Sequence, residues 1–200
     1  AKDNGYFFYK YLKKEHPDIK VKYLIEKKSI DANKIDKRDL IEYGSKEHFI
    51  LFATAGKLIS THIMGFSPQM PFFSKINKYI KVKGKKIFLQ HGIVKDMIPF
   101  LTRKNINVDM FIAGALPEYE YIKNNYGFDE KIIKYTGLAR YDSLLNEKNN
   151  NILIMPTWRN WLFYIKNGED FKKTEYFKRY SELINDKDMI ELLNEYNYNL

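Results

Sequence analysis

The feature that most constrains the fold is a repeated alternation between segments with helical spacing and short apolar runs. Aromatic and aliphatic residues recur at helical spacing over 6–15, and residues 19–25 (IKVKYLI) alternate as a half-buried strand does. Residues 36–52 are mostly helical in pattern, and residues 57–63 (KLISTHI) favour a strand. Helix, strand, helix, strand is the order expected of a parallel sheet with crossover helices.

The alternation resumes after a long irregular stretch. Residues 64–86 mix prolines, aromatics and lysines without clean periodicity, which indicates a long connection. That connection is either a solvated loop or a segment that binds an acceptor or an anionic membrane surface. Further along, the pattern predicts strands at 87–90, 110–113 and 132–136, a helix at 117–126, a turn at Gly137 and a short helix at 141–145.

A polar, asparagine-rich run at 146–151 (NEKNNN) is the best candidate for a domain boundary. Beyond it, residues 152–155 (ILIM) predict a buried parallel strand closed by Pro156, and residues 175–200 are helical in pattern. One strand and two helices are too little to close a sheet or bury a core. We therefore expect an N-terminal domain at 1–146, a linker at 147–151 and the incomplete start of a second domain at 152–200.

Composition favours a soluble globular protein. The hydrophobic fraction of 44% is ordinary, no apolar run approaches the roughly 18 residues of a membrane-spanning helix, and the N-terminus shows no signal pattern. Because the sequence has no cysteine, it can form neither a disulfide nor a thiolate metal site, which suits a reducing compartment. We expect a cytoplasmic protein.

The net charge of +9 leaves two interpretations open. It either serves an anionic partner, such as a nucleotide, a polyphosphate, nucleic acid or an acidic lipid surface, or it reflects a bias toward lysine along the whole chain. Arginine is scarce, so an arginine in a motif carries more information than any lysine.

The candidate site follows from the predicted strand ends, because open parallel sheets bind ligands beyond the carboxyl ends of their strands. His91 and Gly92 follow the strand at 87–90. A histidine there can act as a general base or bind phosphate, and glycine lets a ligand approach the backbone. Lys95, placed one helical turn further on, adds positive charge. The alternative is a purely structural histidine.

Thr157 and Arg159 follow the strand predicted at 152–155 in the same way. The guanidinium fork of arginine binds phosphate, and the backbone N–H groups of a following helix start add donors. The alternative is that Trp158 and Trp161 are core residues and that Arg159 pairs with a carboxylate. Together with His91, this stretch predicts a ligand-binding cleft between two domains.

Residues 136–142 (TGLARYD) are a third motif, in which Arg140 is either a salt-bridged brace or a phosphate contact. His62 ends another predicted strand and is a lesser candidate, better explained as a core or rim residue. The acidic residues, among them Glu118, are scattered, and there is no HExxH pattern or glycine-rich phosphate loop. The sequence therefore gives no support for metal catalysis.

Four stretches taken in order carry a family resemblance: 88–96 (FLQHGIVKD), 109–128 (DMFIAGALPEYEYIKNNYGF), 133–142 (IKYTGLARYD) and 152–159 (ILIMPTWR). They closely resemble the CDP-glycerol glycerophosphotransferase family, the polyol-phosphate polymerases and primases of teichoic acid and capsule synthesis. That family's pattern is roughly Q-x-W-H-G-T-P-x-K, then S-x-x-E/Y, T-G-x-P-R-x-D and A-P-T-W/F-R. Residues 4–25 also resemble the first helix and strand of the family's catalytic region.

The departures from that pattern bear on specificity. No tryptophan separates Gln90 from His91, Ile93 and Val94 replace the usual Thr-Pro, and Ala139 replaces the proline before the arginine. These changes leave the polyol open. The family's C-terminal half normally supplies a second histidine and a Ser-Asp motif that hold the donor pyrophosphate, and this sequence includes neither, so we expect the 200-residue chain alone to be inactive.

The resemblance implies an α/β protein with a GT-B-like fold, in which a Rossmann-type parallel sheet with flanking helices faces a second Rossmann-type domain that is only begun here. It implies transfer of glycerol phosphate, or a related polyol phosphate such as ribitol phosphate, from a CDP-activated donor to a lipid-linked or polymer acceptor, with release of CMP. His91 is then the catalytic residue, and the substrate-binding residues are Gly92, Lys95, Arg140, Thr157 and Arg159. The resemblance implies no metal or other cofactor. It also implies a cytoplasmic protein that lies peripherally on the inner face of the cell membrane.

Two rival functions stay open. A GT-B glycosyltransferase would move a sugar from a nucleotide sugar with a similar cleft and similar basic residues. A non-catalytic binder of anionic polymer or lipid would use the charge alone, and its binding would fall steeply with salt. A nucleic-acid module is disfavoured, because the sequence lacks a recognised motif and has few arginines.

Overall fold

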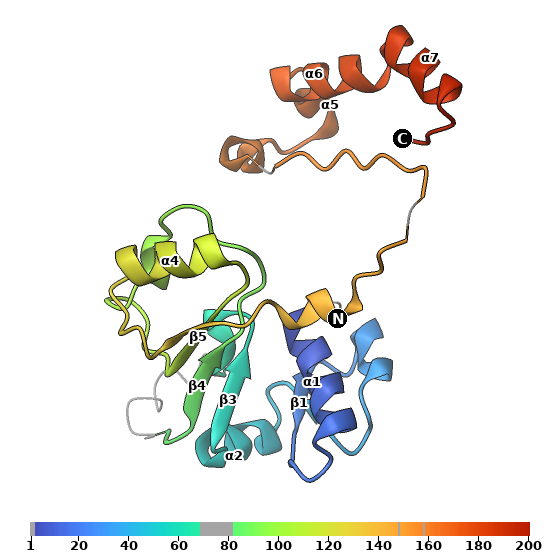
Figure 1. Ribbon diagram of the computed structural model, residues 1–200. Coiled ribbons are helices and arrows are strands. Elements are labelled where there is room, and N and C mark those ends of the chain that lie inside the picture. Colours follow the sequence, from blue (N-terminus) through green and yellow to red (C-terminus); the bar gives the residue numbers. More distant parts are fainter. Residues whose placement is uncertain (1–2, 69–81, 148, 158) are drawn as a thin grey trace. The chain divides into compact units, whose positions relative to one another are not determined.

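The computed structural model describes residues 3–68, 82–147, 149–157 and 159–200. The chain divides into two compact units, Ala1–Leu144 and Leu145–Leu200 (Figure 1). The first unit contains the sheet on which the candidate histidine lies.

The N-terminal unit is built on a four-stranded parallel sheet. Its strands are β3 (Lys57–Ser60), β4 (Lys85–Phe88), β5 (Met110–Ala113) and β6 (Ile133–Tyr135), in the order β3-β4-β5-β6. The main helices of this unit are α1 (Asn4–Glu15), α2 (Lys46–Thr54) and α4 (Leu116–Asn125). The parallel α/β class predicted from the sequence is confirmed.

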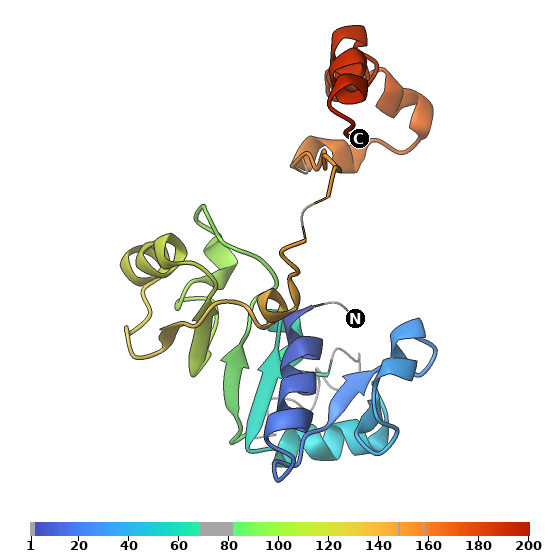
Figure 2. The ribbon, with the colours of Figure 1, turned by 45° about the vertical axis from the view of Figure 1, so that its right-hand side comes forward.

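The two faces of the sheet are covered by different helices (Figures 1 and 2). On one face, Phe88, Phe111 and Ile133 are buried against Ile122 and Tyr126 at the end of α4. On the other face, Leu89, Ile112 and Leu138 form a smaller cluster that Phe8 of α1 contacts. This two-sided burial explains why the central strand β5 (MFIA) is apolar throughout.

A second, two-stranded parallel sheet corrects part of the sequence prediction. It pairs β1 (Tyr23–Ile25) with β2 (Leu40–Glu42), so the helix expected over 36–52 is wrong in its first half. Ile41 is buried, and the three-residue pairing overrides the local helical pattern. Helix α2 begins only at Lys46, where the Ser45 hydroxyl accepts a hydrogen bond from the backbone N–H of His48 at 3.2 Å.

Short 3-10 turns fill most of the remaining connections. Among the described residues they are η1 (Ile30–Lys34), η2 (Ile63–Phe66), η4 (Pro99–Leu101), η5 (Ala139–Ser143) and, in the C-terminal unit, η6 (Asn160–Tyr164). Gly137, where a turn was predicted, has a positive φ of 78°, in the left-handed region that glycine adopts readily. The long connection expected over 64–86 lies largely outside the described residues, which end at 68 and resume at 82.

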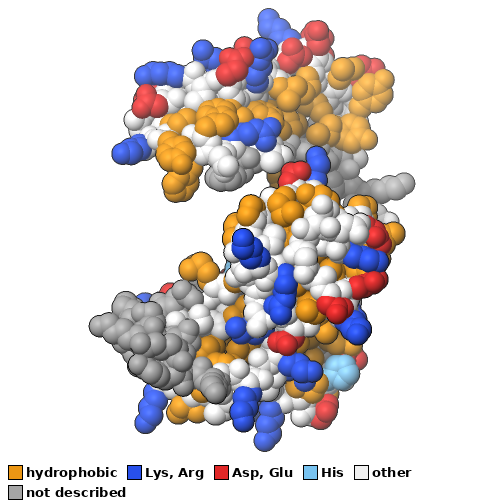
Figure 3. All heavy atoms as spheres, turned by 90° about the vertical axis from the view of Figure 1, so that its left-hand side faces the viewer, with side chains coloured by type: hydrophobic (Ala, Val, Ile, Leu, Met, Phe, Trp, Pro, Cys, Tyr) orange, Lys and Arg blue, Asp and Glu red, His pale blue; other side chains and the backbone are white. Residues whose placement is uncertain are grey.

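The C-terminal unit contains the helices α5 (Gly168–Lys172), α6 (Glu175–Ile184) and α7 (Lys187–Glu195). The buried strand expected at 152–155 is wrong: Leu153 and Met155 are each 79% exposed, and the adjacent Asn151 makes a single parallel bridge to Asn199. A buried parallel strand needs neighbouring strands, and the described residues of this unit form none. Apolar side chains accordingly gather on its surface, in the upper part of Figure 3.

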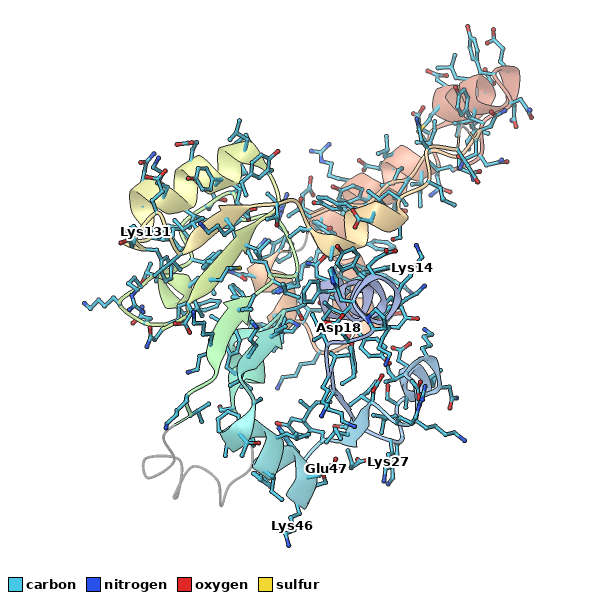
Figure 4. All side chains as sticks on the ribbon, turned by 60° about the horizontal axis from the view of Figure 1, so that its bottom comes forward. Lys14, Asp18, Lys27, Lys46, Glu47 and Lys131 are labelled. Carbon is cyan, nitrogen blue, oxygen red and sulfur yellow. The ribbon has the colours of Figure 1, made fainter. Side chains whose placement is uncertain are left out.

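Charged side chains are spread over the whole molecule. Figure 4 labels Lys14, Lys27, Lys46 and Lys131 on four separate segments, together with the acidic Asp18 and Glu47. Among the described helices, none combines the length and apolar character needed to cross a membrane.

Candidate functional site

Two histidines meet at the carboxyl ends of neighbouring strands. His62 follows β3 and His91 follows β4, and because these strands pair in parallel, their ends lie side by side. The two imidazole rings stack with centroids 4.5 Å apart and planes 27° apart. Both side chains are exposed. His62 was a lesser candidate in the sequence, and the signal that identifies it is its position after a strand adjacent to that of His91.

The hydrogen bond made by His91 selects its tautomer. Its Nδ1 lies 3.3 Å from the carbonyl oxygen of Thr61. A carbonyl oxygen can only accept, so this hydrogen bond requires a proton on Nδ1. The neutral ring then carries its lone pair on Nε2, which leaves Nε2 as the atom that can accept a proton from a substrate.

The residue before His91 has an unusual backbone conformation. Gln90 has φ at 58°, in the left-handed region that non-glycine residues rarely adopt, at a cost of about 1–2 kcal/mol. Its buried side chain donates from Nε2 to the Ile112 carbonyl at 2.8 Å and to Oε1 of Glu118 at 3.0 Å. These bonds hold the strained turn that ends β4 and sets the direction of the histidine loop.

Glu118 holds the loop that follows β4 in place, a role that the sequence analysis did not predict. Its carboxylate is buried and accepts from the backbone N–H groups of Val94 (to Oε1) and Gly114 (to Oε2), each at 2.6 Å, in addition to Gln90. It lies in the first turn of α4, where the helix dipole favours negative charge. Glu118 thus ties residues 91–94 to the end of β5, and its first-turn position was the available signal.

Tyr126 fixes the far end of the same loop. Its hydroxyl accepts from the backbone N–H of Ile98 and donates to the carbonyl of Asp96, both at 3.0 Å. Burial raises the pKa of Tyr126, so the hydroxyl keeps its proton for the second bond. The loop from His91 to Ile98 is therefore anchored at both ends.

Arg140 braces the backbone of His91. Its Nη1 donates to the His91 carbonyl at 2.8 Å and lies 3.6 Å from the carboxylate of Asp3. The backbone N–H of Arg140 donates to Oδ1 of Asn4, whose Nδ2 donates to the Gln90 carbonyl at 2.7 Å. The structure thus supports the brace, and the phosphate contact of Arg140 stays a prediction.

Two glycines near the histidine differ in the space around them. A Cβ on Gly92 would meet nothing within 4 Å, so this side of the loop is open. A Cβ on Gly114 would lie 2.6 Å from Cδ1 of Ile93 and 2.7 Å from Cγ of Leu138. Gly114 therefore allows the histidine loop and the turn before Arg140 to pack on the end of β5.

Lys95 is exposed, but the helical turn that was expected to carry it is absent: residues 91–98 form an irregular loop. The hydrogen bonds that hold this loop involve the backbone of Val94, Asp96 and Ile98, so it does not follow helical geometry. Its role toward a phosphate stays a prediction.

Thr157 and Arg159 lie in the C-terminal unit, and both are exposed. Arg159 directly precedes η6, which replaces the helix expected there, and the hydroxyl of Tyr176 donates to the Thr157 carbonyl at 3.4 Å. Trp161, expected as core in the alternative interpretation, is 48% exposed, while Trp158 lies outside the described residues. A single site shared by these residues and His91 stays a prediction.

The fold and the site together define a class: a parallel α/β protein with an oriented histidine at the carboxyl edge of its sheet. Among the described residues, no three histidine, aspartate or glutamate side chains gather as a metal ion would require. Ligands bind at such an edge, and an oriented histidine there can transfer a proton.

The comparison with protein families identifies the class further. The sequence profile described as CDP-Glycerol:Poly(glycerophosphate) glycerophosphotransferase matches residues 1–199, and the chain belongs to this family. It is 36% identical, over 214 aligned positions, to the minor teichoic acid biosynthesis protein GgaB of Bacillus subtilis (strain 168). The alignment covers 100% of this chain and 24% of the relative, so the chain spans about a quarter of that protein's length. No solved structure matches.

Proposed function

We propose that the protein transfers glycerol phosphate from CDP-glycerol to a hydroxyl of a growing teichoic acid. The family to which the chain belongs supports the reaction. The observation that carries the assignment to a site is the orientation of His91, whose Nδ1 contacts the Thr61 carbonyl and whose Nε2 is left for substrate.

His91 acts as the general base in this proposal. Nε2 takes the proton of the acceptor hydroxyl as that oxygen forms a bond to the phosphorus of the glycerol phosphate group. The bond from this phosphorus to the bridging oxygen of CMP breaks, and the electron pair leaves with CMP. Positioned general bases typically contribute about 10²–10⁴-fold to rate.

The remaining groups bind and position phosphates. The open side of Gly92 gives room for the donor next to the backbone. Lys95, Thr157 and Arg159 supply charge and hydrogen bonds to the donor pyrophosphate, and Arg140 contributes through the His91 backbone or by a phosphate contact. Phosphoryl transfer depends mainly on positioning and charge stabilisation, so this set of residues is chemically sufficient to assist it.

Two further features belong to the proposal. The donor-side domain completes a GT-B-like cleft opposite the parallel sheet, and the lysine excess favours a peripheral position on the anionic inner face of the cell membrane. The acceptor is a lipid-linked or polymeric polyol phosphate, and the same chemistry serves a capsular polymer or a ribitol phosphate donor.

The test is a donor panel with the protein in its full natural length. CMP release is measured from CDP-glycerol and CDP-ribitol in the presence of a teichoic acid acceptor, with UDP-glucose and GDP-mannose in parallel reactions scored for nucleotide release. Turnover restricted to a CDP-polyol supports the proposal. Turnover only with a nucleotide sugar overturns it in favour of a glycosyltransferase.

A further inference from the structure

A second histidine, His62, follows β3 next to His91, and the proposed reaction assigns it no role. His62 and His91 present their rings on neighbouring strand ends, with centroids 4.5 Å apart. A group bound at Nε2 of His91 therefore lies within reach of the His62 ring. Two exposed imidazole rings this close can contact the same bound group.

Local hydrogen bonds fix the position of His62. The Ser60 hydroxyl accepts from the backbone N–H of His62 at 3.1 Å and donates to its carbonyl at 2.6 Å. That carbonyl also accepts from the N–H of Gly65 at 3.0 Å, and a Cβ on Gly65 would lie 2.1 Å from the Ser60 hydroxyl oxygen. The turn after β3 therefore requires both the serine hydroxyl and the absence of a side chain at position 65.

The same turn orients His91. Thr61, between Ser60 and His62, supplies the carbonyl that holds Nδ1 of His91. One three-residue segment thus sets the tautomer of the first imidazole and places the second against it. This coupling makes the segment part of the site.

The ring nitrogens of His62 make no hydrogen bond to the protein within the described ranges, whereas Nδ1 of His91 is engaged. An imidazole N–H is a good donor to a phosphate oxygen. The guanidinium of Arg140, which donates a hydrogen bond to the His91 carbonyl, adds positive charge near the two histidines. The surface therefore offers one proton acceptor, Nε2 of His91, beside a separate donor on His62.

The geometry points to His62 as a second substrate-contacting residue: it donates a hydrogen bond to a non-bridging oxygen of the phosphoryl group while His91 accepts the proton of the attacking hydroxyl. This assignment rests on the proposed glycerophosphotransferase function. It divides the work between the two rings, with His62 stabilising charge on the phosphoryl group and His91 moving the proton.

Three substitutions separate hydrogen bonding from stacking, assayed by CMP release from CDP-glycerol with the protein in its full natural length. His62→Ala and His62→Phe should each lower kcat/KM by about 10²-fold, as expected for loss of one transition-state donor. His62→Gln, which keeps an N–H donor, should recover part of that loss. Wild-type kcat/KM in His62→Phe would overturn the proposal in favour of stacking alone. His16→Ala, an exposed histidine away from the strand ends, is the control and should match wild type.

A binding experiment keeps this inference separate from the proposed reaction. Inorganic phosphate is titrated into the full-length protein with ¹⁵N-labelled histidine, and the imidazole signals are followed by NMR. We expect the signals of both His62 and His91 to shift, and the His91 shift to weaken in His62→Phe. If CDP-glycerol is not turned over but these shifts occur, the reaction is wrong and the two-histidine phosphate site stands. An unshifted His62 signal refutes the site.

Discussion

The role assigned to Glu118 can be tested through stability. The buried carboxylate accepts three hydrogen bonds, from Gln90 and Val94 on one oxygen and from Gly114 on the other. Leaving a buried donor unsatisfied costs about 1–3 kcal/mol, and water entering the cavity recovers part of that cost. Glu118→Ala should therefore lower the free energy of unfolding by about 4 kcal/mol.

Glu118→Gln should cost less, about 2 kcal/mol. The amide oxygen can keep the two bonds on one side, but its NH₂ group then faces the N–H of Gly114, which is also a donor. Glu118→Ala should also speed hydrogen exchange at the Val94 and Gly114 amides, because both lose their acceptor, whereas Glu118→Gln should do so only at the Gly114 amide.

The assay is urea unfolding followed by far-UV circular dichroism. Glu120→Gln is the matched control: it makes the same change on the same helix at an exposed position and should shift the free energy of unfolding by less than about 0.5 kcal/mol. An unchanged unfolding midpoint in Glu118→Gln, or equal losses in both variants, would refute the reasoning.

Three further predictions concern the same unit. Gly114→Ala should destabilise it by about 1–3 kcal/mol by overpacking, whereas Gly92→Ala should leave the urea midpoint unchanged and weaken donor binding, measured as a higher KM. Burial raises the pKa of Asp39, but hydrogen bonds from Lys13 and Tyr9 outweigh it, so the pKa is lowered overall. The stability that this carboxylate contributes is present above the ordinary aspartate pKa of about 4 and is lost as the pH falls. Asp39→Asn should therefore make the decrease of the urea unfolding midpoint with falling pH shallower. An unchanged dependence of the midpoint on pH would contradict this. Arg140→Ala should lower the free energy of unfolding by about 1–2 kcal/mol, and a loss of donor affinity with unchanged stability would show a phosphate contact instead of the brace.

The sequence pattern predicted the sheet well where local and tertiary preferences agree. The strand at 110–113 lies where the apolar run predicted it. Phe111 and Ala113 are buried on the face that α4 covers, and Ile112 is buried on the opposite face with Leu89 and Leu138. The helical pattern over 36–52 failed at β2, since its three residues are strand only through pairing with β1. At 152–155, an apolar run without neighbouring strands stays exposed.

The sequence pointed to the candidate histidine but not to the residues that support its loop. A histidine and glycine at a strand end could be interpreted directly, because parallel sheets place such residues at one edge. The partners of that loop, Glu118, Asn4 and His62, are distant in sequence and become neighbours only through the order of the strands and the packing of α1. Without the strand order, these long-range hydrogen bonds and the stacked rings could not be inferred.

The central claim is that His91 is the base of a CDP-glycerol-dependent transferase. Its most direct test compares single-turnover CMP release from CDP-glycerol by the full-length wild type, His91→Ala and the exposed control His16→Ala, with folding checked by circular dichroism. We predict a loss of at least about 10²-fold in His91→Ala and wild-type rates in His16→Ala. A correctly folded His91→Ala protein that releases CMP at the wild-type rate would contradict the assignment.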